Sequence, residues 1–399
     1  MSKIELLAPA GDLTRAKIAI KYGADAVYIG GKSFSLRSRA SNFDIADIKE
    51  AVLFAKQYQA KIYVTVNIIP HQEDLHGVDQ YLKQLEQIGV SAVICSSVEI
   101  IKIAKRVAPK MEVHLSTQQS VTNSQAIAFY KDLGVDRVVL ARELSMKEIA
   151  LTNKNSSLPL EVFIHGGMCA NYSGRCTISN FMTLRDANRG GCAHSCRWFY
   201  HLHDHEKQLT TSERLFTLAA TDLIALQQIP SLIDMGIVSL KIEGRMKSAY
   251  YIAAVVKTYR LLIDEYYQEK MITKERMNWY KKEMAKAENR LASSGYLEGL
   301  PQEDPQAALR QVTASQEYLG TVIDIEKDRL LLEVRNRFEK GDLVEILSQS
   351  DMNKTFVVND ITDEEGQALR VCNRPMQKVW ITVPYKVNID DMLRRGERT

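Results

Sequence analysis

The first 165 residues alternate seven times between a short β-branched run and an amphipathic stretch, and this alternation restricts the fold more than any other feature. Strands joined by helices lie parallel in one sheet, because each helical crossover carries the chain back to the same end of the sheet. The expected helices include Leu13–Tyr22, Ile45–Gln57 and Ser124–Leu133. The expected strands are Ile4–Ala8, Asp25–Gly30, Lys61–Val66, Ala92–Ser96, Met111–Ser116, Asp136–Leu140 and Leu160–His165.

An eighth strand is expected at Ile237–Ile242, followed by a helical stretch from Ala249 to about Arg290. Eight strand–helix units close a TIM-type (β/α)8 barrel, which typically takes about 250 residues plus insertions. An open doubly wound sheet is the alternative. The barrel is favoured because the count reaches eight without forcing any segment, so we expect an α/β barrel over residues 1–300.

A second, smaller domain is expected at the C-terminus. A loop with Pro301 and Pro305 begins a linker over residues 301–316, and from Glu317 the pattern changes to short alternating strands. Short strands separated by turn residues predict a small β-barrel, here over residues 317–390. Its expected strands are Tyr318–Ile325, Arg329–Val334, Leu343–Ile346, Thr355–Ile361, Ala368–Cys372 and Trp380–Tyr385.

Composition excludes some classes of protein. The N-terminal MSKIELLAPAG has no apolar region of signal-peptide type, and no apolar stretch approaches the roughly 18 residues of a membrane span. We therefore expect a cytoplasmic protein with reduced thiols. The formal net charge of +3 is too small to indicate nucleic-acid binding, so any basic surface has to be local.

Four of the six cysteines lie in a long insertion, about residues 166–236, between the seventh and eighth strands. Loops that follow barrel strands emerge at the C-terminal face, where barrel enzymes carry their active sites. Four thiolates complete the coordination of a structural zinc ion or of an iron–sulfur cluster, and a reducing compartment disfavours disulfides. Unrelated buried thiols remain the alternative. The candidate metal ligands are Cys169, Cys176, Cys192 and Cys196; the two other cysteines, Cys95 and Cys372, are expected in the cores.

The same insertion contains two further patterns. Alternating His201, His203 and His205 would share one face of a strand, either as a metal site or, more commonly, as the solvent side of a hairpin. Arginines and aromatic side chains alternate along the insertion, which suits single-stranded or loop RNA, although acidic residues dilute the charge and a solvated face is an equal alternative. They are Arg175, Arg185, Arg189, Arg197 and Arg214, with Tyr172, Phe181, Trp198, Phe199 and Tyr200.

Residues at the C-terminal ends of the strands should surround the barrel mouth. They are Asn67, Ser116, Gln118, Arg142, Glu143, His165, Lys241, Glu243 and Arg245. Arginine forks bind carboxylates and phosphates, so Arg142, Lys241 and Arg245 are the candidate substrate-binding residues. Pairing of Lys241 with Glu243, or of Arg142 with Glu143, is the structural alternative. His165 and Glu243 are the candidate catalytic residues.

Four segments of the sequence carry a resemblance to a known family. The segments LLAPAGDLTRAKIAIKYGADAVYIGG and SLKIEGRMKSAYY, with YSGRC and RDANRGGCAHSCRW around the cysteines, resemble the family historically called peptidase U32. The resemblance covers nearly the whole chain, including a C-terminal β-domain. It extends to bacterial members that hydroxylate tRNA and rRNA, and it implies a [4Fe–4S] cluster on cysteines that match Cys169, Cys176, Cys192 and Cys196.

The motifs are most similar to those of the members that make 5-hydroxyuridine at the tRNA wobble position. That resemblance implies prephenate as co-substrate and the tRNA anticodon loop as partner, and it leaves open a paralogous U32 subunit. Family members of the ubiquinone pathway place their fourth cysteine further along the chain, and this sequence departs from them because it has no cysteine between Cys196 and Cys372.

Two other functions remain as alternatives. Proteolysis would have to use a Cys/His dyad with His194 or His165, because the sequence has neither H-E-x-x-H nor G-x-S-x-G. A single nucleophilic thiolate leaves three neighbouring cysteines unexplained. A non-catalytic RNA-binding subunit that acts with a paralogue is the third possibility.

Overall fold

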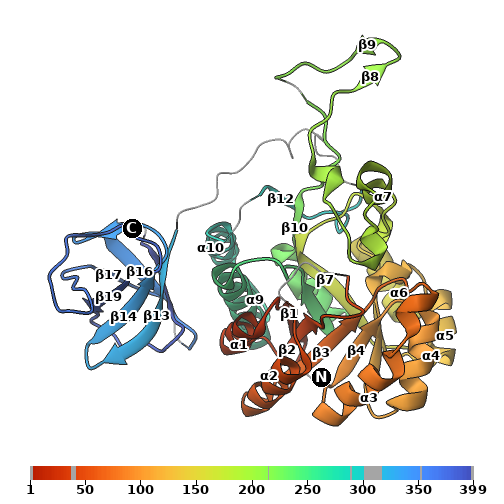
Figure 1. The fold of residues 1–399 in the computed structure, drawn as a ribbon, viewed down its shortest axis with the longest axis horizontal. Coiled ribbons are helices and arrows are strands. Elements are labelled where there is room, and N and C mark those ends of the chain that lie inside the picture. The colour runs from red at the N-terminus through yellow and green to blue at the C-terminus, as the bar shows by residue number, and fades with distance from the viewer. Residues whose placement is uncertain are drawn as a thin grey trace.

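The computed structural model describes residues 3–36, 42–213, 215–287, 290–300, 317–350 and 353–396. Eight parallel strands form a closed barrel (Figure 1). Strand β11 pairs in parallel with both β7 and β1, with Leu240 opposite Val162 on one side and Leu6 on the other. This closure confirms the TIM-type barrel and excludes the open sheet. The strands are β1 Glu5–Pro9, β2 Ala26–Gly30, β3 Lys61–Val66, β4 Ala92–Cys95, β5 Glu112–Leu115, β6 Arg137–Val139, β7 Leu160–Gly167 and β11 Ser239–Ile242.

Helices surround the barrel, and side chains cap the first turns of most of them. Asp12 accepts a hydrogen bond from the Arg15 backbone N–H, and Ser145 with Glu148 forms a capping box. None of the described helices has the length and apolar character needed to cross a membrane. They are α1 Leu13–Lys21, α2 Ile45–Gln57, α3 Val78–Ile88, α4 Val98–Val107, α5 Ser124–Asp132, α6 Met146–Lys154, α8 Ile229–Asp234, α9 Ala249–Glu269 and α10 Lys274–Ala285.

The helical stretch from Ala249 to about Arg290 is two helices rather than one, which corrects the sequence prediction. Helix α9 ends at Glu269, and the backbone of the following residue, Lys270, adopts the left-handed conformation (φ 58°). Helix α10 begins at Lys274, directly after Thr273, whose hydroxyl accepts a hydrogen bond from the Arg276 N–H. The chain reverses in between, and α10 packs against α9.

The barrel interior contains a buried ion network beneath the mouth. The Glu161 side chain is fully buried and accepts from Lys241 Nζ (2.7 Å) and Arg137 Nη1 (3.2 Å). Arg137 also pairs with Glu5 at 2.6 Å, and Tyr63 donates to the other Glu5 oxygen at 2.6 Å. Charged side chains from β1, β6, β7 and β11 thus form ion pairs with one another inside the barrel. An unpaired charge in this buried position would destabilise the fold.

The insertion after β7 adds an irregular layer over the mouth. It contains the short helix α7 Ile178–Thr183 and a hairpin of β8 His203–Asp204 and β9 Lys207–Gln208, which projects away from the barrel (Figure 1). The chain then returns as β10 Asp222–Ile224, antiparallel to β7, and the two-residue strand β12 Ala292–Ser293 pairs with β10. Strand β10 was not expected from the sequence.

The C-terminal β-domain is confirmed. A six-stranded antiparallel sheet, in the order β17-β16-β20-β13-β14-β19, curves around its own apolar core as a half-barrel. Strand β20, which pairs with both β13 and β16, was not predicted because its sequence MLRR does not alternate. The expected linker, residues 301–316, lies outside the described residues. The strands are β13 Tyr318–Glu326, β14 Arg329–Val334, β15 Phe338–Glu339, β16 Leu343–Leu347, β17 Lys354–Val357, β18 Val371–Cys372, β19 Lys378–Thr382 and β20 Met392–Arg395.

The β-domain packs on α1, α9 and α10. Tyr318 of β13 stacks on Tyr250 of α9, with ring centroids 4.8 Å apart. Arg394 of β20 is completely buried and pairs with Glu283 of α10 as well as with Glu345 of its own sheet. These contacts fix the β-domain on the side of the barrel.

Candidate functional site

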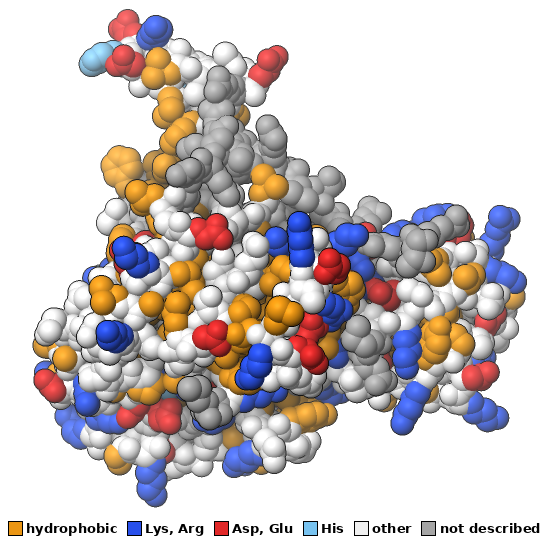
Figure 2. Space-filling view, turned by 180° about the vertical axis from the view of Figure 1, so that it is seen from behind, with side chains coloured by type: hydrophobic (Ala, Val, Ile, Leu, Met, Phe, Trp, Pro, Cys, Tyr) orange, Lys and Arg blue, Asp and Glu red, His pale blue; other side chains and the backbone are white. Residues whose placement is uncertain are grey.

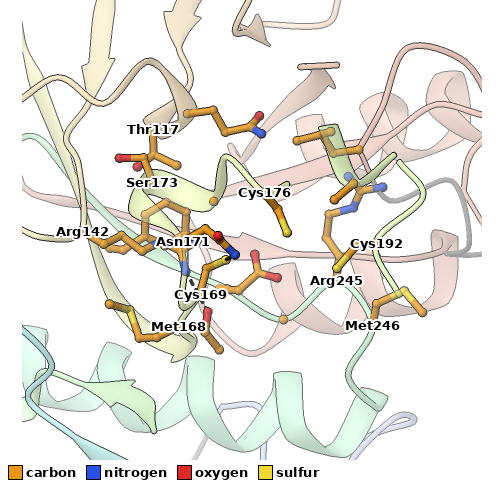
Figure 3. A pocket seen from close by; sticks show the side chains of 18 of the residues that line it. Thr117, Arg142, Met168, Cys169, Asn171, Ser173, Cys176, Cys192, Arg245 and Met246 are labelled. Carbon is orange, nitrogen blue, oxygen red and sulfur yellow. Dashed lines mark hydrogen bonds between the residues drawn. The ribbon is translucent and has the colours of Figure 1, made fainter. Parts of the chain in front are cut away.

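A pocket at the C-terminal mouth of the barrel is lined both by strand ends and by the insertion (Figure 3). Its volume of about 250 Å³ is near the lower limit for small-molecule sites, so it suits a small organic ligand. The four clustered cysteines and the strand-end residues Arg142, Lys241, Glu243 and Arg245 all line it. The structure therefore brings together two groups of residues that the sequence analysis found separately.

The four cysteine side chains line the same pocket. Cys176 is buried, the other three are partly exposed, and all four are free thiols. Burial raises the pKa of the Cys196 thiol, and the nearby Cys169, Cys192 and Cys176 raise it further, whereas Arg197 lowers it. The sulfurs of Cys169, Cys176 and Cys192 project into the pocket from loops of the insertion (Figure 3).

Polar groups of the insertion hold the cysteine loops in place. The Asn188 side chain accepts from the Cys176 N–H (3.2 Å) and donates to the Cys176 carbonyl oxygen (2.9 Å). The Ser179 N–H points at the Cys176 sulfur from 3.5 Å, and the Asn171 amide at the Cys169 sulfur from 4.0 Å. N–H donors directed at cysteine sulfurs are how proteins tune iron–sulfur clusters.

The donor set fits a metal group bound by cysteines. Four thiols face one pocket, and donors to sulfur are already in place at two of them. Within the described ranges, no three His, Cys, Asp or Glu side chains are arranged to hold a metal ion. The fit therefore rests on the chemistry of the donors and not on a preformed coordination geometry.

The Arg142 side chain lines the pocket. Its guanidinium lies 3.7 Å from the centre of the Phe163 ring and donates to the Gly167 carbonyl oxygen at 2.7 Å. It forms no ion pair with any residue that the structure describes. The suggested partner Glu143 instead accepts from the Ser173 N–H (2.6 Å) and hydroxyl, and so anchors the insertion.

Arg245 also lines the pocket, but its guanidinium is buried against β2 and β3. It donates to the side-chain oxygens of Ser35 (2.9 Å), Thr65 (3.1 Å) and Asn42 (2.8 Å). A Cβ atom at Gly30 would stand 2.0 Å from its Nη2 atom, so a larger residue there would displace the guanidinium. These contacts give Arg245 a structural role in shaping the pocket wall.

Lys241 has an internal ion-pair partner. Its ammonium is bound to the buried Glu161 at 2.7 Å and lies over the ring of Tyr28. The structural alternative therefore holds for Lys241, although its partner is Glu161 and not Glu243. A lysine paired in this way contributes less to ligand binding than the sequence analysis assumed.

The two candidate catalytic residues lie in different environments. Glu243 lines the pocket and accepts from the Tyr28 hydroxyl at 3.0 Å. His165 is buried outside the pocket lining, beside Tyr251 and Tyr259. Burial, with a smaller effect of Lys247, lowers the pKa of His165 to about 3. The structure thus supports Glu243 as a group that can meet a ligand, and it places His165 behind the pocket wall.

Asp222, Lys247 and Arg290 also line the pocket, and the sequence analysis missed them. Asp222 begins β10, the strand that was not expected, and it meets Arg290 at 2.7 Å and Lys247 at 3.7 Å. Lys247 lies within the SLKIEGRMKSAYY motif, and membership of that motif is the sequence signal that could have identified it.

The arginines proposed for RNA have different roles. Arg189 pairs with Glu73 and Asp74, Arg175 donates to the Gln118 carbonyl oxygen, and Arg185 donates to the Cys192 carbonyl oxygen. Arg197 lines the pocket, and Arg214 lies outside the described residues.

The three histidines lie on or beside the projecting hairpin, as the solvent-face alternative predicted. Four of the aromatic side chains of the insertion are exposed, and Figure 2 shows hydrophobic side chains below the hairpin.

Comparison with known proteins agrees with this architecture. The profile of Peptidase family U32 matches residues 11–307, and that of the Peptidase family U32 C-terminal domain matches residues 314–394. The tRNA hydroxylation protein P1 of Bacillus subtilis (strain 168) is 43% identical over 99% of this chain and 95% of its own length.

Two other relatives have different names. The 23S rRNA 5-hydroxycytidine C2501 synthase of Escherichia coli (strain K12) is 39% identical over 67% of this chain and 40% of its own length. A protein named Collagenase from Porphyromonas gingivalis (strain ATCC BAA-308 / W83) is 32% identical over 67% of both chains.

Proposed function

The chain belongs to peptidase family U32, and we propose that it is an RNA-hydroxylating enzyme that acts on the wobble uridine of tRNA. One observation carries the proposal: a relative named as a tRNA hydroxylation protein is 43% identical along nearly the whole of both chains. The pocket adds chemical support, because it combines four thiols, a carboxylate and cationic side chains at the mouth of a barrel.

The proposed cofactor is a [4Fe–4S] cluster held by Cys169, Cys176, Cys192 and Cys196. All four face the pocket, and N–H donors point at two of the sulfurs. When bound, such a cluster supplies electron transfer or Lewis-acid activation, and the electrostatics around its sulfurs set its potential. The protein's own contribution is to hold the thiols beside the ligand pocket.

Prephenate is the proposed co-substrate and the proposed source of the hydroxyl group. It is a small acid with two carboxylates, and the pocket is small and partly cationic. Arg142 can bind one carboxylate with charge-assisted hydrogen bonds, because its guanidinium has no ion-pair partner among the described residues. Arg245 shapes the adjacent wall, and Lys241 contributes positive charge from beneath.

Glu243 is the proposed proton acceptor. Transfer of a hydroxyl group from the donor acid to C5 oxidises the uracil ring by two electrons and reduces the donor carbon that loses the hydroxyl group. The hydrogen of C5 leaves as a proton, so a base in the pocket must accept it. Glu243 is a carboxylate of the pocket lining, and the Tyr28 hydroxyl fixes one of its oxygens at 3.0 Å. An oriented carboxylate next to the ligand is the arrangement that general-base catalysis needs.

The tRNA anticodon loop is proposed to approach over the insertion. Phe181 is 86% exposed, and Tyr172, Trp198 and Phe199 are about half exposed, so aromatic faces are available to unstacked bases. Bases of loops stack on such side chains, whereas bases inside a duplex cannot reach them. Arg175, Arg185 and Arg189 already bind other groups of the chain. Base stacking should therefore contribute more to RNA binding than phosphate contacts do.

Loss of the gene tests this function. In a strain without other U32 members, deletion should remove a uridine derivative from tRNA digests that is heavier than uridine by the mass of one oxygen. Wild-type protein and the Cys372→Ala variant, altered in the β-domain, should restore it, whereas Cys176→Ala should not. An unchanged nucleoside profile in the deletion strain would refute the function.

The metal content tests the cofactor separately. Protein purified without oxygen should contain about four iron and about four sulfide per chain, as a [4Fe–4S] cluster bound by four cysteines requires. The Cys192→Ala variant should lose the visible absorbance. Stoichiometric zinc without sulfide would contradict the cluster assignment.

Peptide hydrolysis is the second candidate, and the relative named Collagenase is the observation that favours it. A thiol nucleophile next to His194 would be required, and both kinds of residue line the pocket. Peptide cleavage that survives removal of the metal, together with unchanged tRNA nucleosides, would establish this second function.

A further inference from the structure

A second group of cations lies in the pocket, apart from the predicted anion ligands. Arg197, Lys247 and Arg290 are all pocket residues, and Asp222 lies among them. Asp222 pairs with Arg290 at 2.7 Å and with Lys247 at 3.7 Å. The three basic residues come from the insertion, from the segment after β11 and from the segment before β12, so only the folded chain brings them together.

Positive charge exceeds negative charge in this group. Asp222 can neutralise one of the three cations, and the Arg197 guanidinium has no ion pair or hydrogen bond with another described residue. Burial lowers the pKa of Lys247; Asp222 opposes this effect, whereas Arg290 and Arg197 lower the pKa further. The Cys196 thiol is a further acidic neighbour, because Arg197 lowers its pKa and it raises the pKa of Arg290. Asp222 and this thiol together can balance two of the three cations, so an anion entering the pocket would balance the third.

The cations are sheltered in the pocket wall. The Lys247 and Arg290 side chains are 24% and 28% exposed, and that of Asp222 is 10% exposed. Lys247 is held over the Tyr251 ring at 4.7 Å, and Arg290 donates to the Ala220 carbonyl oxygen at 2.8 Å. A small ligand inside the pocket can reach these groups more readily than the phosphates of a bulky RNA.

Gly167 connects this group to Arg142. Arg142 donates to the Gly167 carbonyl oxygen, and a Cβ atom at Gly167 would lie 3.2 Å from Arg197 Nη2 and 3.8 Å from Asp222 Oδ1. Arg142 and Arg197 thus both lie next to Gly167, at the end of β7. A ligand with one carboxylate needs only one of these cations, whereas a dicarboxylate can bind both.

We propose that Arg197, Lys247 and Arg290 form a second carboxylate subsite, which binds one end of the donor acid while Arg142 binds the other. This inference rests on the proposed function, in which the donor is a dicarboxylate. The subsite makes the enzyme select dicarboxylic over monocarboxylic acids, because an acid with one carboxylate leaves the second cationic position unsatisfied. Selection of this kind depends on the difference in binding free energy between the two acids.

Calorimetric titration of the cluster-loaded protein with prephenate, and with the monocarboxylate phenylpyruvate, tests the subsite. Arg290→Gln and Lys247→Met should each weaken prephenate binding by roughly ten- to a hundredfold, as expected for a lost charge-assisted contact. Phenylpyruvate binding should change by less than about threefold in the same variants. Arg337→Gln, an exposed arginine of the β-domain, is the matched control and should bind both acids like the wild type.

The outcomes separate this inference from the function on which it rests. Failure of the wild type to bind prephenate refutes the donor assignment itself. Prephenate binding that persists in both variants, or an equal loss for both acids, refutes the subsite alone. If the variants change the cluster absorbance and leave prephenate affinity intact, the cations serve the thiolates and the subsite is again refuted. Weaker tRNA binding with unchanged prephenate affinity would assign the cations to RNA phosphate.

Discussion

Replacement of Lys241 by methionine should destabilise the barrel, because it leaves the buried Glu161 with one cation instead of two. Burial alone would raise the pKa of Glu161, but Lys241 and then Arg137 outweigh it and lower the pKa to about 2. The difference from the usual 4.5 corresponds to roughly 3 kcal/mol at about 1.4 kcal/mol per pH unit. Lys241 is the larger of the two attractive contributions, so Lys241→Met should cost about 2–3 kcal/mol.

Urea unfolding, followed by the helical circular dichroism signal, measures this loss, because the described helices all belong to the barrel portion of the chain. The matched variant is the double substitution Glu161→Gln/Lys241→Met. It removes the uncompensated charge and leaves Arg137 paired with Glu5 at 2.6 Å, so most of the lost stability should return.

The sign of the pH dependence gives a second measurement on the same proteins. The pKa of Glu161 is lower in the folded than in the unfolded state, so its contribution is fully present above pH 4.5 and is lost as pH falls towards 2. Lys241→Met should reduce that dependence. Wild-type stability in Lys241→Met, combined with loss of prephenate binding, would show that Lys241 is a ligand residue and that its ion pair with Glu161 does not stabilise the barrel.

Burial lowers the pKa of His165 to about 3, so this side chain should make the protein less stable as pH falls below 6.5. Urea titrations should show that the His165→Gln variant loses less stability than the wild type between pH 7 and pH 5. Arg394→Met should cost about 3–5 kcal/mol and speed proteolytic release of the β-domain, because Glu283 and Glu345 both lose a buried cationic partner; equal proteolysis rates would contradict this. Gly30→Ala should lower the melting temperature, because its Cβ would stand 2.0 Å from the Arg245 guanidinium. An unchanged melting temperature would argue against close packing of Gly30 on Arg245.

Much of the fold follows from local patterns. The eight barrel strands and the three helices with predicted bounds, Leu13–Tyr22, Ile45–Gln57 and Ser124–Leu133, agree with the structure within two residues, because apolar periods act over a single turn or strand. The two helices α9 and α10 were read as one, because the break at Lys270 requires only a left-handed residue and has no proline or glycine to mark it. Strand β20 was missed because Arg394 is buried by ion pairing, which a hydrophobic pattern cannot show.

The site divides in the same way. By itself the sequence determined which residue types reach the barrel mouth: four closely spaced cysteines in one insertion, and basic residues at the ends of strands. Only the tertiary structure decided what each charge meets. Lys241 pairs with Glu161, which is 80 residues away in the sequence. Asp222 forms ion pairs with both Lys247 and Arg290. The role of a cation depends on its distance from the nearest opposite charge. Closure of the barrel sets this distance, even for residues that are far apart along the chain.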